Sequence, residues 1–157
     1  MSISRPINLA LMTSLFFTIH AFAQEKEKRI KRSDLPAAVK KTIRHESHGA
    51  TIRGFSEEKE KGQTFYEAQL MVDGHSKDVL MDANGAIAEI QEEVSGQALP
   101  ALAREGLQAK AGKSKLLKVE SITKRGKVVA YEAVVLTGGK KSELQVGPDG
   151  RTLDHEE

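Results

Sequence analysis

An internal repeat constrains the fold of this chain of 157 residues more than any other feature of its sequence. Three short motifs recur in the same order: Leu-Pro-Ala at 35–37 and 99–101, Tyr-Glu-Ala at 66–68 and 131–133, and Asn-Gly or Asp-Gly at 84–85 and 149–150. The matched positions are separated by 64 or 65 residues, so the three matches share nearly one register. Such self-similarity predicts that one unit of about 60 residues occurs twice.

Each unit is expected to begin with a helix. Apolar residues at helical spacing follow each Leu-Pro pair: Leu35, Ala38, Val39 and Ile43 in the first unit, and Leu99, Leu102, Ala103 and Leu107 in the second. Ser33 and Asp34 are expected to cap the first helix, and Pro36 suits its first turn. Gly49 and Gly112 are expected to end the two helices.

After each helix the apolar pattern changes to period two, which is typical of strands. The expected strands are 51–56, 64–72, 77–81 and 86–94 in the first unit, and 116–123, 128–136, 142–146 and 151–153 in the second. A polar turn at 57–62 is expected to separate the first two. The predicted fold class is therefore α+β, with two repeats of a helix followed by three to four antiparallel strands and the helices packed on one face of the sheet.

The first residues have the pattern of a cleaved export signal. Arg5 precedes an uncharged apolar run at 7–22, and the small-x-small triplet at 21–23 predicts cleavage after Ala23. An uncleaved membrane anchor is the alternative, but the run is interrupted and is short for a spanning helix. The mature protein is expected to be periplasmic or secreted. The predicted organisation is a signal peptide at 1–23, a charged segment at 24–30, and repeats at 31–95 and 96–157.

Composition excludes several classes of site. The chain has 0 Cys, so it can form no disulfide, use no thiol nucleophile and carry no lipid-modified cysteine. Its 24 Lys and Arg against 22 Asp and Glu give a net charge of +2, and no strongly basic face is evident that would bind nucleic acid. We expect no nucleic-acid partner and no membrane insertion after signal cleavage, and the sequence leaves the oligomeric state open.

The repeated motifs resemble the PepSY domain, and more narrowly the secreted tandem PepSY-like proteins grouped with β-lactamase-inhibitor-like folds. Leu-Pro at the helix start, Tyr-Glu-Ala in a strand and Asx-Gly in a turn carry the resemblance in both units, from about residue 31 to 153. The resemblance implies a non-catalytic helix-on-sheet unit, in a family whose members inhibit or sense extracytoplasmic partners or lie in peptidase propeptides. No peptidase domain follows either unit, so we expect action in trans.

The second unit departs from the pattern at two helix positions. Ala103 stands where the first unit has the bulkier Val39. Gly106 lies within the predicted helix, where glycine lowers helix stability by about 1 kcal/mol relative to alanine.

No constellation in the chain predicts catalysis. The pair His45 and His48 has a spacing of three, whereas the helical zinc-peptidase motif needs two histidines four residues apart with a glutamate between them. With His75 they are the alternative metal site, of a metal- or small-ligand-responsive sensor, although exposed histidines at a helix end and a turn are the simpler interpretation. Adjacent carboxylates such as Glu92 and Glu93 are expected to be exposed. We expect no enzyme activity and no cofactor.

Strand alternation predicts a second, partly polar sheet face. If the helices cover Tyr66, Ala68 and Leu70, the intervening side chains point away from them. The expected partner-binding residues on this face are Glu67, Gln69, Met71, Glu132 and Val134. The predicted function is to bind or inhibit an extracytoplasmic protein, such as a peptidase or hydrolase, through this face. A solvated sheet face in a structural envelope protein is the remaining alternative.

Overall fold

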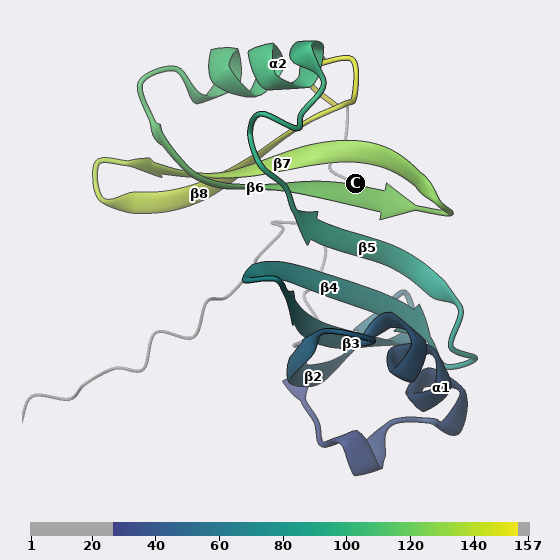
Figure 1. Cartoon of the computed structure of the whole chain (residues 1–157). Helices are drawn as coiled ribbons and strands as arrows, with labels where there is room; N and C mark the ends of the chain where they lie inside the picture. The colour runs from purple at the N-terminus through teal and green to yellow at the C-terminus, as the bar shows by residue number, and fades with distance from the viewer. Residues whose placement is uncertain (1–26, 154–157) are drawn as a thin grey trace, which may run out of the picture.

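The computed structural model describes residues 27–153 (Figure 1). The predicted signal peptide and its cleavage site lie outside the described residues. The elements in chain order are β1 (Lys28–Arg29), a 3-10 turn (Arg32–Asp34), α1 (Ala37–Glu46), β2 (Thr51–Glu60), β3 (Gln63–Val72), β4 (His75–Asp82), β5 (Ile87–Glu93), α2 (Ala101–Ala111), β6 (Lys115–Lys124), β7 (Lys127–Thr137) and β8 (Lys140–Val146).

The strands form one antiparallel sheet of eight strands in the order β1-β2-β3-β4-β5-β6-β7-β8. Each strand is therefore a neighbour of the strand that precedes it in the sequence, and α2 lies in the connection between β5 and β6. Five residue pairs, from Glu89 with Lys124 to Glu93 with Glu120, join β5 to β6. The predicted α+β class is confirmed, and the sheet is continuous across the middle of the chain.

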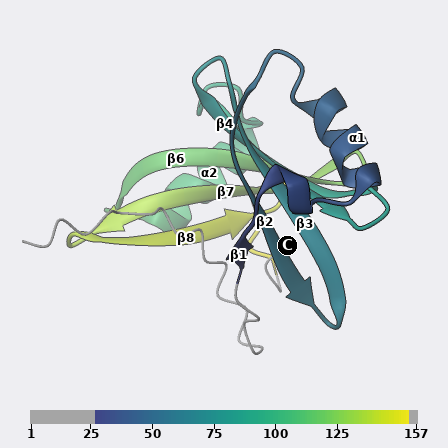
Figure 2. The ribbon, with the colours of Figure 1, turned by 90° about the horizontal axis from the view of Figure 1, so that it is seen from below.

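Both helices pack on the same face of this sheet, α2 over β6–β8 and α1 against the strands of the other half (Figures 1 and 2). Side chains at the end of β5 and directly after it show that the two helices share one face. Ile90 packs against the apolar cluster under α1, and Val94 packs against the cluster under α2. Because alternate residues of a strand point to the same side, these two side chains place the helices on one face.

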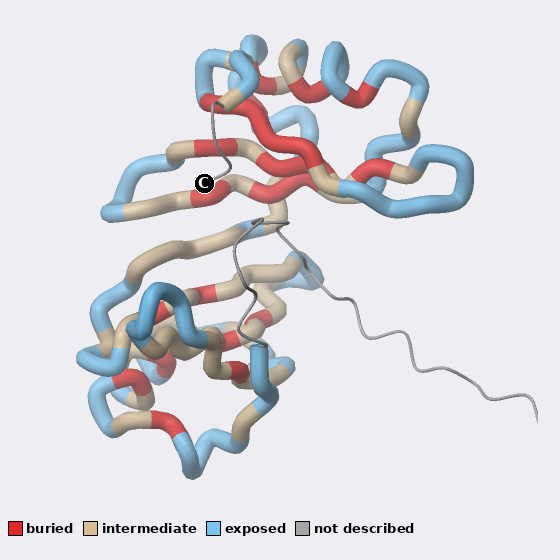
Figure 3. The backbone as a smooth tube through the Cα atoms, turned by 180° about the vertical axis from the view of Figure 1, so that it is seen from behind, coloured by how far each residue is buried: buried red, intermediate tan, exposed pale blue. Residues whose placement is uncertain are grey.

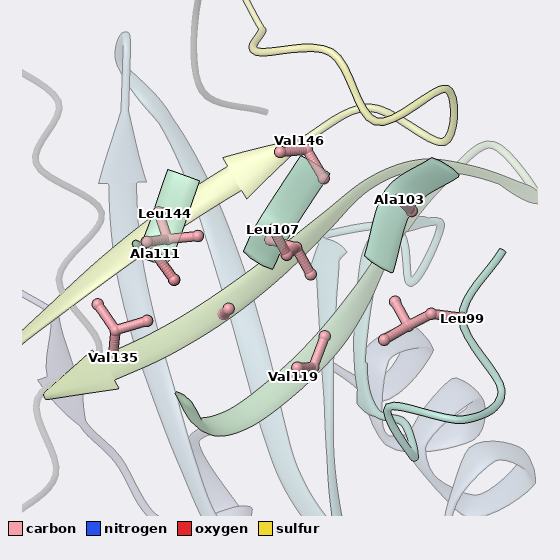
Figure 4. Packing of buried hydrophobic residues seen from close by; sticks show 9 residues of the cluster. Leu99, Ala103, Leu107, Ala111, Val119, Val135, Leu144 and Val146 are labelled. Carbon is pink, nitrogen blue, oxygen red and sulfur yellow. The ribbon is translucent and has the colours of Figure 1, made fainter. Parts of the chain in front are cut away.

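The apolar core is divided into two clusters, one under each helix. Under α1 the buried residues are Leu35, Val39, Ile43, Ala68, Leu70, Val79 and Met81. Under α2 they are Leu99, Ala103, Leu107, Ala111, Val119, Ala133, Val135, Leu144 and Val146 (Figure 4). Tyr66 and Tyr131 are partly buried against these clusters, as the alternation predicts. Figure 3 shows buried backbone segments in both halves of the sheet.

The helix starts differ from the prediction. Ser33 and Asp34 belong to the 3-10 turn, where an Asp34 carboxylate oxygen accepts a hydrogen bond of 3.0 Å from the Lys31 backbone N–H. They do not cap α1, which begins after Pro36 without a side-chain cap. Leu35 is extended, as expected for a residue before proline, and so ends the 3-10 turn. Pro36 is also extended, with ψ of 151°, so the helix starts at Ala37.

Two strand boundaries also differ. The first strand of the leading hairpin runs to Glu60, and the turn consists of Lys61 and Gly62, both with positive φ (50° and 80°). Two residues of positive φ suit the twist of a tight hairpin, so the charged residues at 57–60 extend the strand. The predicted strand at 151–153 is absent. Instead, the Arg151 carbonyl accepts a hydrogen bond of 2.9 Å from the Gly147 N–H and closes a turn.

Turn glycines contact the helix backbone in both halves. A Cβ on Gly85 would lie 2.7 Å from the Ala38 carbonyl oxygen of α1, and a Cβ on Gly150 would overlap the Leu102 carbonyl oxygen of α2. A Cβ on Gly106 would in turn overlap the Gly150 carbonyl oxygen. Gly106 thus lowers the intrinsic stability of α2, but its lack of a side chain allows the helix to approach the turn that contains Gly150.

Candidate binding face

The polar face is the side of the sheet opposite the two helices. Its membership follows from strand register, because cross-strand partners point to the same side. Gln69 on β3 is opposite Asp78 on β4, and Met71 is opposite Ser76. The five residues that the sequence predicts as partner contacts all belong to this face, since Glu132 on β7 is likewise paired with Glu120 on β6.

Acidic side chains dominate the central strands of the polar face. On β3 to β7 its carboxylates are Glu67, Asp78, Asp82, Glu89, Glu93, Glu120 and Glu132, and its lysines are Lys115, Lys118, Lys124 and Lys127. The prediction from sequence missed five of these carboxylates, on β4, β5 and β6. The alternation of side chains along each strand could have shown which of these carboxylates share a face within one strand. Which carboxylates of different strands are neighbours depends on strand pairing, which the sequence pattern does not report.

A hydrogen-bonded network crosses the middle of this face. One carboxylate oxygen of Glu120 contacts the Lys118 amino group at 2.8 Å and accepts a hydrogen bond of 3.1 Å from the Ser76 hydroxyl. Ser76 also donates from its backbone N–H to Glu93, at 3.2 Å. Because Ser76 lies on β4 and Glu120 on β6, this contact spans β5. Glu93, expected to be exposed, is therefore a half-buried member of the network.

Burial is uneven across the polar face. Glu120 and Glu132 are 1% and 4% exposed, and the Gln145 side-chain amide donates to Glu132 at 2.7 Å. Glu132 consequently has little surface for direct contact with a partner. The other four predicted contact residues, Glu67, Gln69, Met71 and Val134, are half-buried and present part of their side chains.

The second carboxylate oxygen of Glu120, Oε2, is buried and has no hydrogen-bond partner among residues 27–153. A buried acceptor without a donor costs about 1–3 kcal/mol. This oxygen is an unfilled hydrogen-bond acceptor on the polar face.

The acidic residues shift one another's ionisation. Burial, with a smaller contribution from Asp78, raises the pKa of Glu67 to about 8. Burial and the neighbouring Glu120 raise the pKa of Asp78 to about 6, although Lys118 opposes this shift. Burial also raises the pKa of Glu58 on the adjoining strand β2. At neutral pH Glu67 therefore holds a proton that the same carboxylate would lose in water, whereas Asp78 is mostly ionised.

The structure distributes the three histidines of the alternative metal site over exposed positions. His45 and His48 line a shallow surface hollow with Lys41 and Arg44, whose positive charges disfavour a bound cation. His75, at the start of β4, has its Nδ1 3.6 Å from a Glu93 carboxylate oxygen. Within the part of the chain that the structure describes, no group of three or more His, Cys, Asp or Glu side chains is arranged to hold a metal ion.

Across residues 27–153, neither helix has the length and apolar character needed to cross a membrane.

Comparison with known proteins shows similarity in structure. No protein-family model matches the chain, and no curated protein matches it in sequence. A candidate periplasmic protein from Bacteroides eggerthii has a TM-score of 0.62 at 15% identity, over 78% of this chain and 88% of that one. A BLIP-like protein from Bacteroides fragilis has a TM-score of 0.56 at 21% identity, over 77% and 85%. A DUF2874 family protein from Bacteroides uniformis has a TM-score of 0.60 at 14% identity, over 77% and 88%. The chain therefore has the fold of these BLIP-like and DUF2874 proteins.

Proposed function

We propose that the mature protein is a non-enzymatic extracytoplasmic binding module that docks on, or inhibits, another protein through its polar face. The partner is an exported protein such as a peptidase or hydrolase. The observation that carries the proposal is the placement of both helices on one side of a continuous eight-stranded sheet. On the other side of the sheet Glu67, Gln69, Met71 and Val134 are partly exposed, whereas Ile122 and Ala130 are buried.

The chemistry of the polar face supports docking. Met71 and Val134 supply half-buried apolar surface, while Glu67 and Gln69 supply charge and hydrogen-bonding groups beside it. Interfaces between proteins combine apolar and polar groups. In this proposal the buried Glu132 does not contact the partner directly. It holds the Gln145 side chain in position through their hydrogen bond. The likeness in fold to a BLIP-like protein agrees with a role in binding or inhibition.

The location in the proposal is the periplasm. The export-signal pattern at 1–23, with cleavage after Ala23, supports it. The description of a structural neighbour as a candidate periplasmic protein also supports it.

The tandem PepSY-like organisation, with units at 31–95 and 96–157, is part of the same proposal. All seven residues of the cluster under α1 have a counterpart 64 or 65 positions later in the cluster under α2. The pairs are Leu35 and Leu99, Val39 and Ala103, Ile43 and Leu107, Ala68 and Ala133, Leu70 and Val135, Val79 and Leu144, and Met81 and Val146. The glycines Gly85 and Gly150 also contact equivalent helix carbonyls. These matches support duplication of one unit.

A capture experiment with matched variants tests the docking face. The mature protein, residues 24–157, is immobilised and exposed to a periplasmic extract of its own organism, and retained proteins are identified by mass spectrometry. The test variant is Met71→Arg with Val134→Arg on the polar face. The control is Leu102→Arg, at a 58% exposed position on α2.

We expect one enriched protein that the wild type and the Leu102→Arg variant retain and that the polar-face variant loses. Circular dichroism of both variants verifies that they are folded. Retention of the partner by the polar-face variant, or equal loss from both variants, would contradict docking through this face.

A further inference from the structure

The charge of the polar face is opposite in sign to the charge of the chain. The whole sequence carries +2, but strands β3 to β7 place seven carboxylates and four lysines on the polar face: Glu67, Asp78, Asp82, Glu89, Glu93, Glu120, Glu132, Lys115, Lys118, Lys124 and Lys127. Negative charge is thus concentrated on the one sheet face that lacks a helix. Such a concentration attracts and orients cations and repels anionic partners.

The face already binds ammonium groups of the chain itself. The Lys118 amino group lies 2.8 Å from a Glu120 oxygen and 3.5 Å from the Ser76 hydroxyl. The Lys124 amino group lies 3.4 Å from a Glu89 oxygen. Carboxylates grouped around a lysine amine are a suitable environment for a second cationic side chain wherever acceptors remain in excess.

An excess of acceptors is present beside Lys118. The Oε2 oxygen of Glu120 is buried and has no hydrogen-bond partner in the described part of the chain. Toward β3, Asp78 and Glu67 follow on the same face, and both residues are partly exposed. Burial and neighbouring carboxylates raise the pKa of both, and among the described residues only Lys118 opposes the shift at Asp78.

We propose that this part of the polar face recognises an arginine- or lysine-bearing segment of the partner protein, with the cation lying against Glu67 and Asp78 and attracted further by Glu120. The inference rests on the proposed function, since it specifies the chemistry of what docks on this face. Arginine suits the site better than lysine. Its guanidinium group is more weakly hydrated and offers five N–H donors in a planar fork to several carboxylates at once.

The test measures binding of a defined cationic probe. Fluorescein-labelled hexa-arginine is titrated with the mature protein, residues 24–157, and followed by fluorescence anisotropy at low and at high ionic strength. The test variant is Glu67→Gln with Asp78→Asn, which keeps side-chain shape and prevents either side chain from ionising when a cation binds. The control is Glu105→Gln, an exposed glutamate on α2.

We expect saturable binding at low ionic strength that weakens at least about tenfold in the double variant, equivalent to about 1.4 kcal/mol. The Glu105→Gln variant binds like the wild type. Absence of saturable binding, or equal affinity of the double variant and the wild type, would overturn the inference.

The same double variant in the capture experiment separates this inference from the proposed function. If the partner is lost only from the Met71→Arg, Val134→Arg variant and is retained by the Glu67→Gln, Asp78→Asn variant, docking stands and cation recognition falls. If the captured protein is a second copy of this chain, sedimentation will show a dimer, which contradicts the choice of a separate basic partner.

Discussion

Glu67 is a residue at which stability and binding are expected to oppose each other. Its carboxylate lies on β3 beside the carboxylates of Asp78, Glu58 and Glu27, with only the Gln69 side chain among its neighbours favouring the ionised form. Such a group destabilises the fold when it is charged, because burial and like charges both disfavour the ionised form. The cost is understandable if a cation from a partner compensates it on binding.

The first prediction concerns the pH dependence of stability at Glu67. The folded state holds its proton up to about pH 8, whereas the unfolded chain releases it near the ordinary value of 4.5. Between these values the unfolded state binds fewer protons, so the contribution of Glu67 to stability falls as pH rises through this range. We expect Glu67→Gln to stabilise the protein at pH 8 by at least about 1 kcal/mol, the energy of one pKa unit, and to have little effect at pH 4.

Thermal unfolding of the mature protein and the variant at both pH values checks this prediction. Glu105→Gln, exposed on α2, serves as the control and should leave the melting temperature unchanged. A variant that is less stable than the wild type at pH 8, or equally shifted at both pH values, would show that Glu67 is not a strained carboxylate.

Glu132 shows how burial changes a prediction made from alternation. Its side of the sheet is correct, but at 4% exposure its role is to accept the hydrogen bond from Gln145. We expect Glu132→Ala to destabilise the fold by about 1–3 kcal/mol, because the buried Gln145 amide loses its acceptor. Urea denaturation measures the effect, and Glu105→Ala is the matched exposed control. A loss no larger than that of the control would contradict a structural role.

At the scale of elements, periodicity is enough to predict both helices and seven of the strands, because apolar spacing reports which side of an element is buried. Periodicity fails to predict the role of a residue when that role depends on a contact between elements distant in the sequence. Gly106 is one such position, since its contact with Gly150 depends on how the last turn folds onto α2. The hydrogen bond between Glu120 and Ser76 is another, since Ser76 lies on β4 and no local pattern reports register between strands.

The next prediction tests the contact between α2 and the last turn. Alanine has the higher helix propensity by about 1 kcal/mol, so propensity alone predicts that Gly106→Ala is stabilising. The added methyl group would overlap the Gly150 carbonyl oxygen, and we expect a net destabilisation of about 1–3 kcal/mol. Denaturant unfolding measures the change. Gly96→Ala, at a position with space for a methyl group, is the control. A more stable Gly106→Ala variant would show that the turn does not pack on the helix.

For the whole molecule, the shared sheet has a consequence for cooperativity. The two apolar clusters do not merge, but β5 contributes Ile90 to one and Val94 to the other and is paired with β6. Each half has about 60 residues, a size at which a single core is marginal on its own. The halves are therefore expected to depend on each other for stability.

Ile43→Ala tests this dependence. The residue is 1% exposed in the cluster under α1, and its truncation is expected to cost about 2–5 kcal/mol. We expect a single thermal transition at lower temperature, with loss of hydrogen-exchange protection in β7 as well as in β3. Two separate transitions, with β7 as protected as in the wild type, would show that the halves fold independently.

The central claim is that the polar face, and not the helix side, meets the partner. Hydrogen exchange of the mature protein, free and bound to the partner it captures, tests this most directly. We expect slower exchange on binding in β3, β4, β6 and β7, with α1 and α2 unchanged. Slower exchange confined to the helices, or to the edge strand β8, would show that the partner docks elsewhere.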